Sequence, residues 1–211
     1  MTARQFVRDV LIGRLRAVAL VVGEAFVFGR HRRGDMRMLQ ALGPAHGMRI
    51  VPVRPVMRGG APISSSRVRQ CIAAGKLAQA RQLLGRPPAL YGTVVRGVGR
   101  GRTLGFPTAN IRLIAQVLPP TGVYAVMVQT TRDTRRWQGV MNLGIRPTFG
   151  PGPLVCEVHL LNFSGTLLGQ VVSVSLLARL RNERCFETPD ALARQVRLDL
   201  LRARRLFAQC P

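Results

Sequence analysis

The 211-residue sequence has few acidic, lysine or aromatic residues. It holds 9 acidic residues against 32 basic ones, a net charge of +23, and Lys76 is its single lysine. Aromatic residues make up 5%, so the basic-plus-aromatic pattern of nucleic-acid binders is missing. Residues 1–88 hold 16 basic and 3 acidic residues and residues 89–211 hold 16 and 6, so no basic tail exists. Two explanations stay open, a codon-composition effect and a polyanion partner.

The sequence also lacks long apolar runs and paired cysteines. Its longest apolar run near the start, residues 17–22, is far shorter than the ~18 residues of a membrane span. The arginine-rich start lacks the apolar centre of a signal peptide. No C-x-x-C pair or zinc-like histidine spacing accompanies the cysteines, which are Cys71, Cys156, Cys185 and Cys210. We therefore expect a cytoplasmic protein with structural thiols and no membrane partner.

Hydrophobic residues make up 47% of the chain, which is enough to bury a core and excludes wholesale disorder. In the first 88 residues, strand-like and helix-like segments alternate, which predicts an α/β unit. The expected strands are residues 17–22 and 50–53, the first of a kind that is buried on both faces of a parallel sheet. The expected helices are residues 2–15, 35–42, 64–75 and 77–84, and the first opens with a Thr2–Gln5 capping box.

After residue 88 the pattern changes to short β-type runs separated by Gly, Pro and Asn, which predicts an antiparallel barrel or sandwich. These runs are residues 93–95, 123–130, 137–142, 155–163 and 171–176. Thr188 and Pro189 then predict the start of a C-terminal helix. Its expected apolar stripe consists of Leu192, Val196, Leu200 and Leu201. We therefore expect two units, residues 1–88 and 89–211.

The most informative stretch is residues 92–110, GTVVRGVGRGRTLGFPTAN. Its glycines allow a phosphate to approach the backbone, and its arginines supply charge and forked donors. Thr108 and Asn110 lie two residues apart, so on an extended segment they point the same way, and their hard oxygens suit Mg²⁺. The loop fits neither the Walker pattern nor the dinucleotide pattern. An ordinary turn with local Thr and Asn hydrogen bonds therefore stays open as the alternative.

An acidic residue in an unusual position is a candidate base. A phosphate loop that served phosphoryl transfer would need one group that orients and deprotonates the acceptor alcohol. Of the six carboxylates after residue 88, only Glu157 sits inside a β run, where an acid is disfavoured. Asp190 is explained as a helix-start charge, and Glu187 and Asp199 by solvent exposure. The residues alone leave open whether Glu157 is a base or an outward strand residue paired with an arginine.

Four segments make the second unit recognisable. GFPTAN (105–110), LPPTGVYAV (118–126), GVMNLGIRPTF (139–149) and CEVHLLNF (156–163) together resemble the riboflavin kinase domain of bacterial bifunctional riboflavin kinase/FAD synthetases. The resemblance runs in continuous order through residues 89–205. It implies a Greek-key antiparallel β-barrel with a C-terminal helix, which binds ATP with Mg²⁺ and phosphorylates riboflavin to FMN.

The same resemblance implies site residues. Glu157 is the acid that activates the ribityl hydroxyl, and Thr108 and Asn110 are the metal and phosphate ligands. The glycine loop binds ATP through Gly97, Gly99, Gly101, Arg102 and Gly105. His159 lies on the same strand face as Glu157, and nucleotide binding and a packing or hydrogen-bonding role are both open for it. On the flavin side the matching residues are Arg181, expected to face the new phosphate, Glu183 and Phe186, expected to contact the ring.

The first unit resembles the back half of the same enzymes' FAD synthetase module, a Rossmann-like nucleotidyltransferase. The matching segments are residues 21–29, 33–35 and 63–69. A run of hydroxyls with one arginine at a helix start forms an anion site on first principles. The resemblance makes it a vestigial ATP phosphate site, consisting of Ser64, Ser65, Ser66 and Arg67.

That module's opening turn, which carries two histidines at H-x-G-H spacing, is missing. None of the three histidines, His31, His46 and His159, sits in such a pattern. Ala25 and Val27 also replace the Asp and Arg usual in the family's G-x-D-F-R-F-G run. We therefore expect an N-terminally truncated module that has lost FMN adenylyltransferase activity.

The leading prediction is a riboflavin kinase whose partners are riboflavin and ATP, with Mg²⁺ and without a specific nucleic acid. A non-catalytic flavin- or nucleotide-binding remnant is the alternative. Residues 161–169, LNFSGTLLG, match a family stretch that reads L-D-F-x-G-D-L-Y-G. Asn162, Thr166 and Leu168 thus replace two acids and a tyrosine. We expect the fold to survive this change and the use of ATP to weaken.

Overall fold

A computed structural model describes residues 1–97, 99, 101, 105–114, 117–131, 133–145 and 154–209. The chain divides into two compact units, Met1–Ile63 and Ser64–Pro211. Helices α3 (Ser65–Ala73) and α4 (Leu77–Leu84) fall in the second unit, because Leu77 packs into that unit's core. The compact units therefore divide earlier in the chain than residue 88.

The first unit is built on two parallel strands, β1 (Ala19–Gly23) and β2 (Arg49–Val53). The helical segments are α1 (Ala3–Gln5), η1 (Phe6–Arg14), η2 (Arg30–Arg32), α2 (Met36–Leu42) and η3 (Pro44–His46). Its core is formed by Ala3, Val7, Leu11, Phe28, Leu39 and Met48. Parallel strands with a helical connection confirm the expected α/β character.

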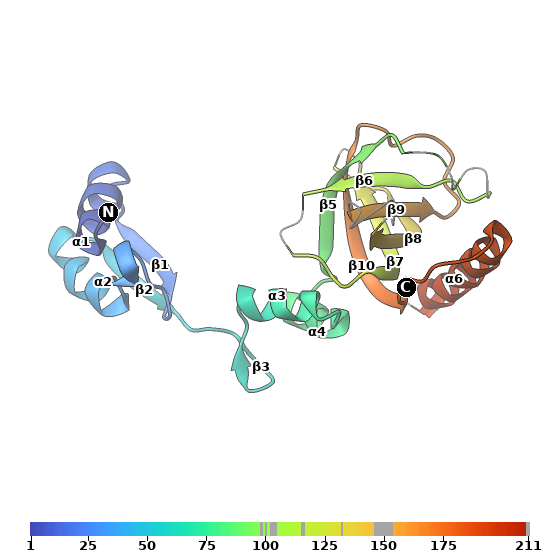
Figure 1. The fold of residues 1–211 in the computed structure, drawn as a ribbon. Helices are drawn as coiled ribbons and strands as arrows, with labels where there is room; N and C mark the ends of the chain where they lie inside the picture. Colours follow the sequence, from blue (N-terminus) through green and yellow to red (C-terminus); the bar gives the residue numbers. More distant parts are fainter. Residues whose placement is uncertain are drawn as a thin grey trace. The chain divides into compact units, whose positions relative to one another are not determined.

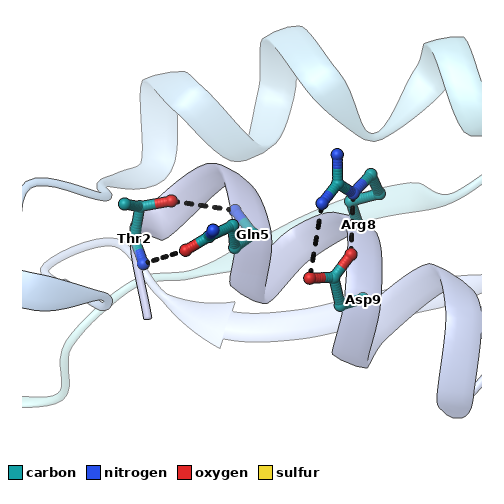
Figure 2. A network of polar contacts seen from close by, with 4 residues as sticks. All are labelled: Thr2, Gln5, Arg8 and Asp9. Atoms are coloured by element: carbon teal, nitrogen blue, oxygen red, sulfur yellow. Dashed lines mark hydrogen bonds and ion pairs between the residues drawn. The ribbon is translucent and has the colours of Figure 1, made fainter.

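Local hydrogen bonds fix the start of this unit, as Figure 2 shows. The Thr2 hydroxyl accepts from the Gln5 amide at 3.2 Å, and the Gln5 side chain accepts from the Thr2 nitrogen at 2.9 Å. The predicted capping box is therefore confirmed. Arg8 donates to Asp9 at 2.7 Å and thereby lowers the pKa of the Asp9 carboxyl.

The prediction that residues 17–22 are buried on both sheet faces is wrong. Burial alternates along β1, and Val21 is 63% exposed. The helical segments cover one face of the pair, through contacts of Leu20 and Val22 with the core. The other face of this two-stranded sheet is open within residues 1–63, all of which the structure describes.

Along the chain, β2 is followed by a short hairpin and two helices. The hairpin pairs β3 (Met57–Arg58) with β4 (Ala61–Pro62). Helix α3 begins at its cap Ser64, whose hydroxyl accepts from the Arg67 amide at 3.3 Å. Gly75 and Gly85 follow α3 and α4 at φ +70° and +72°. A left-handed glycine ends a helix without steric cost, as the sequence predicts here.

The second unit is a closed antiparallel barrel (Figure 1). The strands are β5 (Ala89–Val95), β6 (Ala109–Leu113), β7 (Gly122–Thr130), β8 (Arg136–Ile145), β9 (Leu154–Leu160) and β10 (Val171–Arg181). They follow the order β10-β5-β6-β9-β8-β7, and β10 closes the ring by pairing with both β5 and β7. The segment β6-β9-β8-β7 is a Greek key, so the predicted barrel is confirmed. β6 was missing from the predicted strands.

Helix α6 (Pro189–Gln209) packs on the outer face of β7, β8 and β10, as Figure 1 shows. The Thr188 hydroxyl caps it by accepting from the Ala191 amide at 3.2 Å. Its buried residues are Gln195, Asp199, Ala203 and Phe207. The expected apolar stripe is partly wrong, because Leu201 is 53% exposed. The expected solvent exposure of Asp199 is also wrong, since this residue is 2% exposed.

Candidate active site

Three polar side chains stand in one row on the outer face of the barrel. In register, Asn110 of β6 lies opposite Glu157 of β9, and Asn142 of β8 lies opposite Glu157 from the other side. Their strand neighbours Ile111, Val158 and Met141 and others belong to the core, so alternation turns the three polar side chains outward. Directly opposed residues have Cβ atoms about 5 Å apart, which sets two amides beside one carboxylate.

The glycine loop lies against this row. A Cβ on Gly97 would lie 2.0 Å from the Asn110 side-chain nitrogen, so the amide rests on the bare glycine. A Cβ on Gly101 would lie 3.0 Å from the Thr108 hydroxyl oxygen. The Phe106 amide donates to the Gly101 carbonyl at 2.8 Å and closes the loop. Thr108 and Asn110 are thereby brought together with the glycines that sequence reasoning grouped with them.

Other members of the predicted loop add less. Gly99 and Gly105 have φ of +80° and +81°, a conformation that favours glycine, and a Cβ there would meet nothing within 4 Å. Gly99 and Gly105 are therefore explained by the backbone conformation and not by close packing. Arg102 lies outside the described residues.

His159 supports the segment that carries Thr108. Its Nδ1 lies 2.8 Å from the Pro107 carbonyl oxygen, and its ring meets the edge of Phe106 with centroids 6.0 Å apart. The alternation of β9 sets His159 on the face that carries Glu157, as predicted. The hydrogen-bonding role is observed, and ATP binding by His159 stays a prediction.

Glu183 reaches the same face of the barrel from the segment after β10. A Cβ on Gly144 would lie 1.9 Å from the Glu183 carboxylate, which therefore rests on the backbone of β8. Gly144 follows Asn142 by two residues on the same face, a step of about 7 Å along a strand. The arrangement brings a second carboxylate into the neighbourhood of Glu157.

Arg181 and Phe186 are held by contacts with each other and with α6. The Arg181 Nε donates to the Asp199 carboxylate at 2.9 Å, and both side chains are largely buried, at 15% and 3% exposed. The Arg181 guanidinium also lies 5.6 Å from the Phe186 ring centre. Arg181 is thus engaged by protein groups, and its expected approach to the new phosphate stays a prediction.

The predicted phosphate site at the start of α3 has ordinary helix-start geometry. Ser64 caps the helix, and Ser65 and Ser66 are exposed in its first turn. Arg67 is half-buried and donates its backbone amide to Ser64. Vestigial phosphate binding there stays a prediction.

The segment that departs from the family pattern keeps a defined turn. Asn162 has φ +52°, a left-handed conformation that asparagine tolerates. The Thr166 hydroxyl accepts from the Leu168 amide at 3.2 Å, and Leu168 is 51% exposed. The Gly169 amide donates to the Val94 carbonyl at 2.9 Å, which joins the turn to the strand that leads into the glycine loop.

Sequence reasoning missed Asn142, Gly144, Gln195 and Asp199. Asn142 is the only polar side chain within GVMNLG, and that isolation inside an apolar strand was the signal available. Gln195 and Asp199 gave a signal of another kind, a polar pair four residues apart on the buried stripe of a helix. Gly144 gave none, because its importance depends on a carboxylate from another segment.

The part of the chain that the structure describes shows neither a metal-ligand cluster nor a membrane-spanning helix. Among the described residues, no group of three or more His, Cys, Asp or Glu side chains is arranged to hold a metal ion. In the same part of the chain, no helix is both long and apolar enough to span a bilayer.

Comparison with known proteins gives a consistent family. A riboflavin kinase family model matches residues 84–207, and an FAD synthetase family model matches residues 1–67. The bifunctional riboflavin kinase/FMN adenylyltransferase of Escherichia coli (strain K12) is 43% identical over 207 residues, which cover 98% of this chain and 66% of that protein. The Pseudomonas fluorescens protein of the same description is 39% identical over 209 residues, 99% of this chain and 67% of that one.

A solved structure from Streptococcus pneumoniae, described as a macrolide-efflux protein, superposes with a TM-score of 0.81 at 32% identity. The match covers 97% of this chain and 65% of that one. This chain thus spans about two thirds of the length of the relatives it matches, 66% in the Escherichia coli case. Because the riboflavin kinase model matches more than half of the residues, the chain belongs to the riboflavin kinase family.

Proposed function

We propose that the chain is a riboflavin kinase, which transfers the γ-phosphate of ATP to the ribityl 5′-hydroxyl of riboflavin and yields FMN and ADP. The observation that carries this proposal is the row of Asn110, Glu157 and Asn142 beside the glycine loop. Phosphoryl transfer depends mainly on positioning and charge neutralisation, with one group that accepts the proton of the alcohol. The row supplies a carboxylate between two amides.

Glu157 is the proposed general base. It takes the proton of the ribityl hydroxyl while the hydroxyl oxygen forms a bond to the γ-phosphorus. The bond from that phosphorus to the β–γ bridging oxygen breaks, and the electron pair leaves with ADP. A base positioned in this way contributes about 10²–10⁴-fold to the rate. The flanking amides of Asn110 and Asn142 donate hydrogen bonds that orient neighbouring groups.

Thr108 and Asn110 are the proposed protein ligands of Mg²⁺. The fit rests on their oxygens, which the packing against Gly97 and Gly101 brings to the glycine loop. Mg²⁺ prefers oxygen ligands and takes few of them from the protein when substrate phosphates supply the others. When bound, the ion neutralises charge on the phosphates. Gly97, Gly99, Gly101, Arg102 and Gly105 are proposed to surround those phosphates, with His159 holding Pro107 in place.

The flavin side is proposed to be formed by Arg181, Glu183 and Phe186. Its support is the Glu183 carboxylate on Gly144, which lies on the strand that carries Asn142. An aromatic ring at position 186 offers a surface for a flat ligand.

FMN adenylyltransferase activity is proposed to be lost. Its support is that Ala25 and Val27 occupy positions where the family has an acid and an arginine. The module boundary is proposed at residues 88/89, close to the start of the riboflavin kinase match at residue 84.

Incubation of the purified chain with riboflavin, ATP and Mg²⁺, followed by chromatography with flavin fluorescence, tests both proposals. We expect FMN to form and no FAD to form, either then or from FMN and ATP. The Escherichia coli relative is the control in the same assay. Riboflavin binding without FMN formation would identify a non-catalytic remnant, and FAD formation from FMN would refute the loss of the second activity.

A further inference from the structure

A polar network that is buried at Asp199 and Gln195 joins helix α6 to the end of β10 and to the segment that follows it. The Asp199 carboxylate accepts from the Arg181 Nε at 2.9 Å and from the Gln195 side-chain amide at 2.8 Å. The Gln195 carbonyl oxygen in turn accepts from the Arg184 guanidinium. Asp199 and Gln195 are 2% and 7% exposed. One carboxylate and one amide thus engage two arginines that lie three residues apart in the chain.

The aromatic residue of the segment is held by the same two arginines. The guanidinium of Arg181 lies 5.6 Å from the Phe186 ring centre, and that of Arg184 lies 4.8 Å from it. Both distances are within the range of cation–π attraction. Residues 181–186 are therefore fixed at both ends by groups that Asp199 and Gln195 hold.

Glu183 lies between the two fixed arginines in the sequence. Its carboxylate rests on Gly144 and reaches the barrel face that carries Asn142 and Glu157. Glu183 itself is exposed, and among the described residues no hydrogen bond holds its carboxylate. Its place over β8 thus depends on the backbone on either side, which the buried network holds.

A gain in folding stability is not a sufficient explanation for this buried network. A buried ion pair loses hydration on both partners, and replacing such a pair by apolar side chains of similar volume is often neutral or stabilising. The other two buried positions of the α6 stripe, Ala203 and Phe207, are apolar. Gln195 and Asp199 are polar residues in the same buried stripe, and both carboxylate oxygens of Asp199 accept hydrogen bonds. This pattern indicates that the two residues serve to position the side chains that they contact.

We propose that Asp199 and Gln195 are positioning residues for riboflavin, acting through Arg181 and Arg184 to set Glu183 and Phe186 on the acceptor side of the site. The inference rests on the proposed riboflavin kinase function. The proposed ATP side is formed by the glycine loop and β6, whereas the network is formed by α6 and residues 181–186. The network therefore affects binding of riboflavin and leaves binding of ATP unchanged.

Asp199→Asn tests the proposal with almost no change in shape. It removes the charge that faces Arg181, an interaction of the charge-assisted kind, so we expect riboflavin affinity to fall about 10- to 100-fold. The readouts are the riboflavin Kd from fluorescence quenching, and KM for riboflavin and for ATP. We expect KM for ATP and kcat at saturating riboflavin to stay within about twofold of the parent. Asp190→Asn, an exposed acid on the same helix, is the control.

Gln195→Met is the second variant, because it keeps the volume of the side chain and removes the hydrogen bonds to Arg184 and Asp199. It is expected to weaken riboflavin binding less than Asp199→Asn and in the same direction. A third variant, Gly144→Ala, displaces the Glu183 carboxylate without touching the network, at a position with no positive φ. It should reproduce the selective loss of riboflavin affinity.

The outcomes are distinguishable from failure of the proposed function. If the parent binds riboflavin and makes no FMN, the kinase proposal fails, and the Kd measurements still test the network. A lower melting temperature with unchanged riboflavin Kd in the variants would overturn the positioning role. So would equal losses of ATP and riboflavin affinity. If Asp199→Asn does not fold, an unchanged riboflavin Kd in Gln195→Met overturns the proposal as well.

Discussion

Both units of this chain contain short apolar strands, but these strands pair differently in the two units. In residues 1–63, β1 and β2 pair only with each other, and Val18, Val21 and Val56 are 79%, 63% and 70% exposed. In the barrel, β10 pairs with β5 and β7 and closes the ring. A parallel pair leaves open edges and an open face, whereas closure removes the edges altogether.

The difference in strand pairing indicates which unit can hold catalytic side chains in a fixed geometry. A base and its neighbours act only if their geometry is held within a fraction of an ångström, so they need strands that cannot shift. Glu157 lies on a strand paired on both sides, with Asn110 and Asn142 as its register partners. Glu24, the acid that follows β1, is half-exposed and forms a long ion pair with Arg54 at 3.9 Å. The same residue type is thus fixed in one unit and loosely held in the other.

The largest expected effect comes from removing the base in the barrel. Glu157→Gln keeps the size of the side chain and removes its basic oxygen, so kcat should fall about 10²–10⁴-fold with little change in ATP affinity. Glu24→Gln is the matched variant in the first unit and should leave FMN formation unchanged. The measurement is steady-state FMN formation. Turnover of Glu157→Gln near the parental rate would make Glu157 a structural residue and would remove this contrast.

Hydrogen exchange tests the contrast in stability directly. Amides of β1 and β2 should exchange through local opening, while those of β7 and β10 should exchange only through global unfolding of the barrel. We expect protection to differ by at least about 10²-fold, since each 1.4 kcal/mol is a factor of ten. Mass spectrometry of peptides from the two regions measures it. Equal protection in β1 and β10 would show that the two units share one cooperative transition.

A pair of glycine substitutions compares the two units at smaller scale. Gly97→Ala places a Cβ 2.0 Å from the Asn110 nitrogen and displaces that amide, so KM for ATP should rise about tenfold, the equivalent of one lost hydrogen bond. Gly23→Ala in β1 meets its nearest atom at 4.0 Å and should change no kinetic constant. An unchanged KM for ATP in Gly97→Ala would place Asn110 outside the nucleotide site.

Leu168→Tyr tests the departure from the family pattern in the turn after β9. The added ring and hydroxyl should lower KM for ATP by a factor of about 5–30, at an interaction worth ~1–2 kcal/mol. KM for riboflavin should stay nearly constant. Leu201→Tyr, at a leucine of similar exposure on α6, is the control. A change confined to the riboflavin constant would place this turn on the acceptor side.

The last expected effect is on stability and not on activity, and it concerns the barrel core at alkaline pH. Burial, with the nearby Glu157 charge, raises the pKa of the Cys156 thiol from 9.0 to about 12. Between these values the unfolded chain releases a proton that the folded chain keeps. The contribution to stability is therefore full below pH 9 and falls as the pH rises to about 12, by up to about 1.4 kcal/mol per pH unit.

Urea unfolding of the parent and of Cys156→Ala at pH 8, 10 and 11 measures this loss. The variant should be less stable at pH 8 and should show a shallower decline with pH than the parent. Cys185→Ala, at an exposed thiol outside the core, should keep the parental slope. Parallel declines in all three proteins would show that the Cys156 thiol does not contribute.

Features of the fold that depend on close neighbours were predictable from the sequence. The Thr2–Gln5 capping box and the Ser64 cap each involve residues three apart, and both occur as expected. The strand β6 was missed although ANIRL alternates polar with apolar residues, a pattern typical of a half-buried strand. It is stabilised by β5 and β9 on its two sides, partners that no local pattern reveals.

The residues of the candidate site likewise divide into those that the sequence pattern revealed and those that it did not. Glu157 could be found because an acid inside an apolar run is an exception, and Thr108 and Asn110 because they follow the glycine loop. Asp199 was assigned to solvent because it lies in a charged helix, yet its partner Arg181 is 18 residues earlier in the chain. Only the packing of α6 on the barrel brings the two together, so the sequence pattern alone gave the wrong environment.

Closure of the barrel also affects which substitutions the chain can accept during evolution. The backbone pairing of strands β5 to β10 is completed among residues 89–181. The hydrogen-bonded strands around Glu157 therefore do not depend on pairing with the strands that precede β5. Substitutions in the first unit, such as those at Ala25 and Val27, therefore leave the backbone pairing around Glu157 intact.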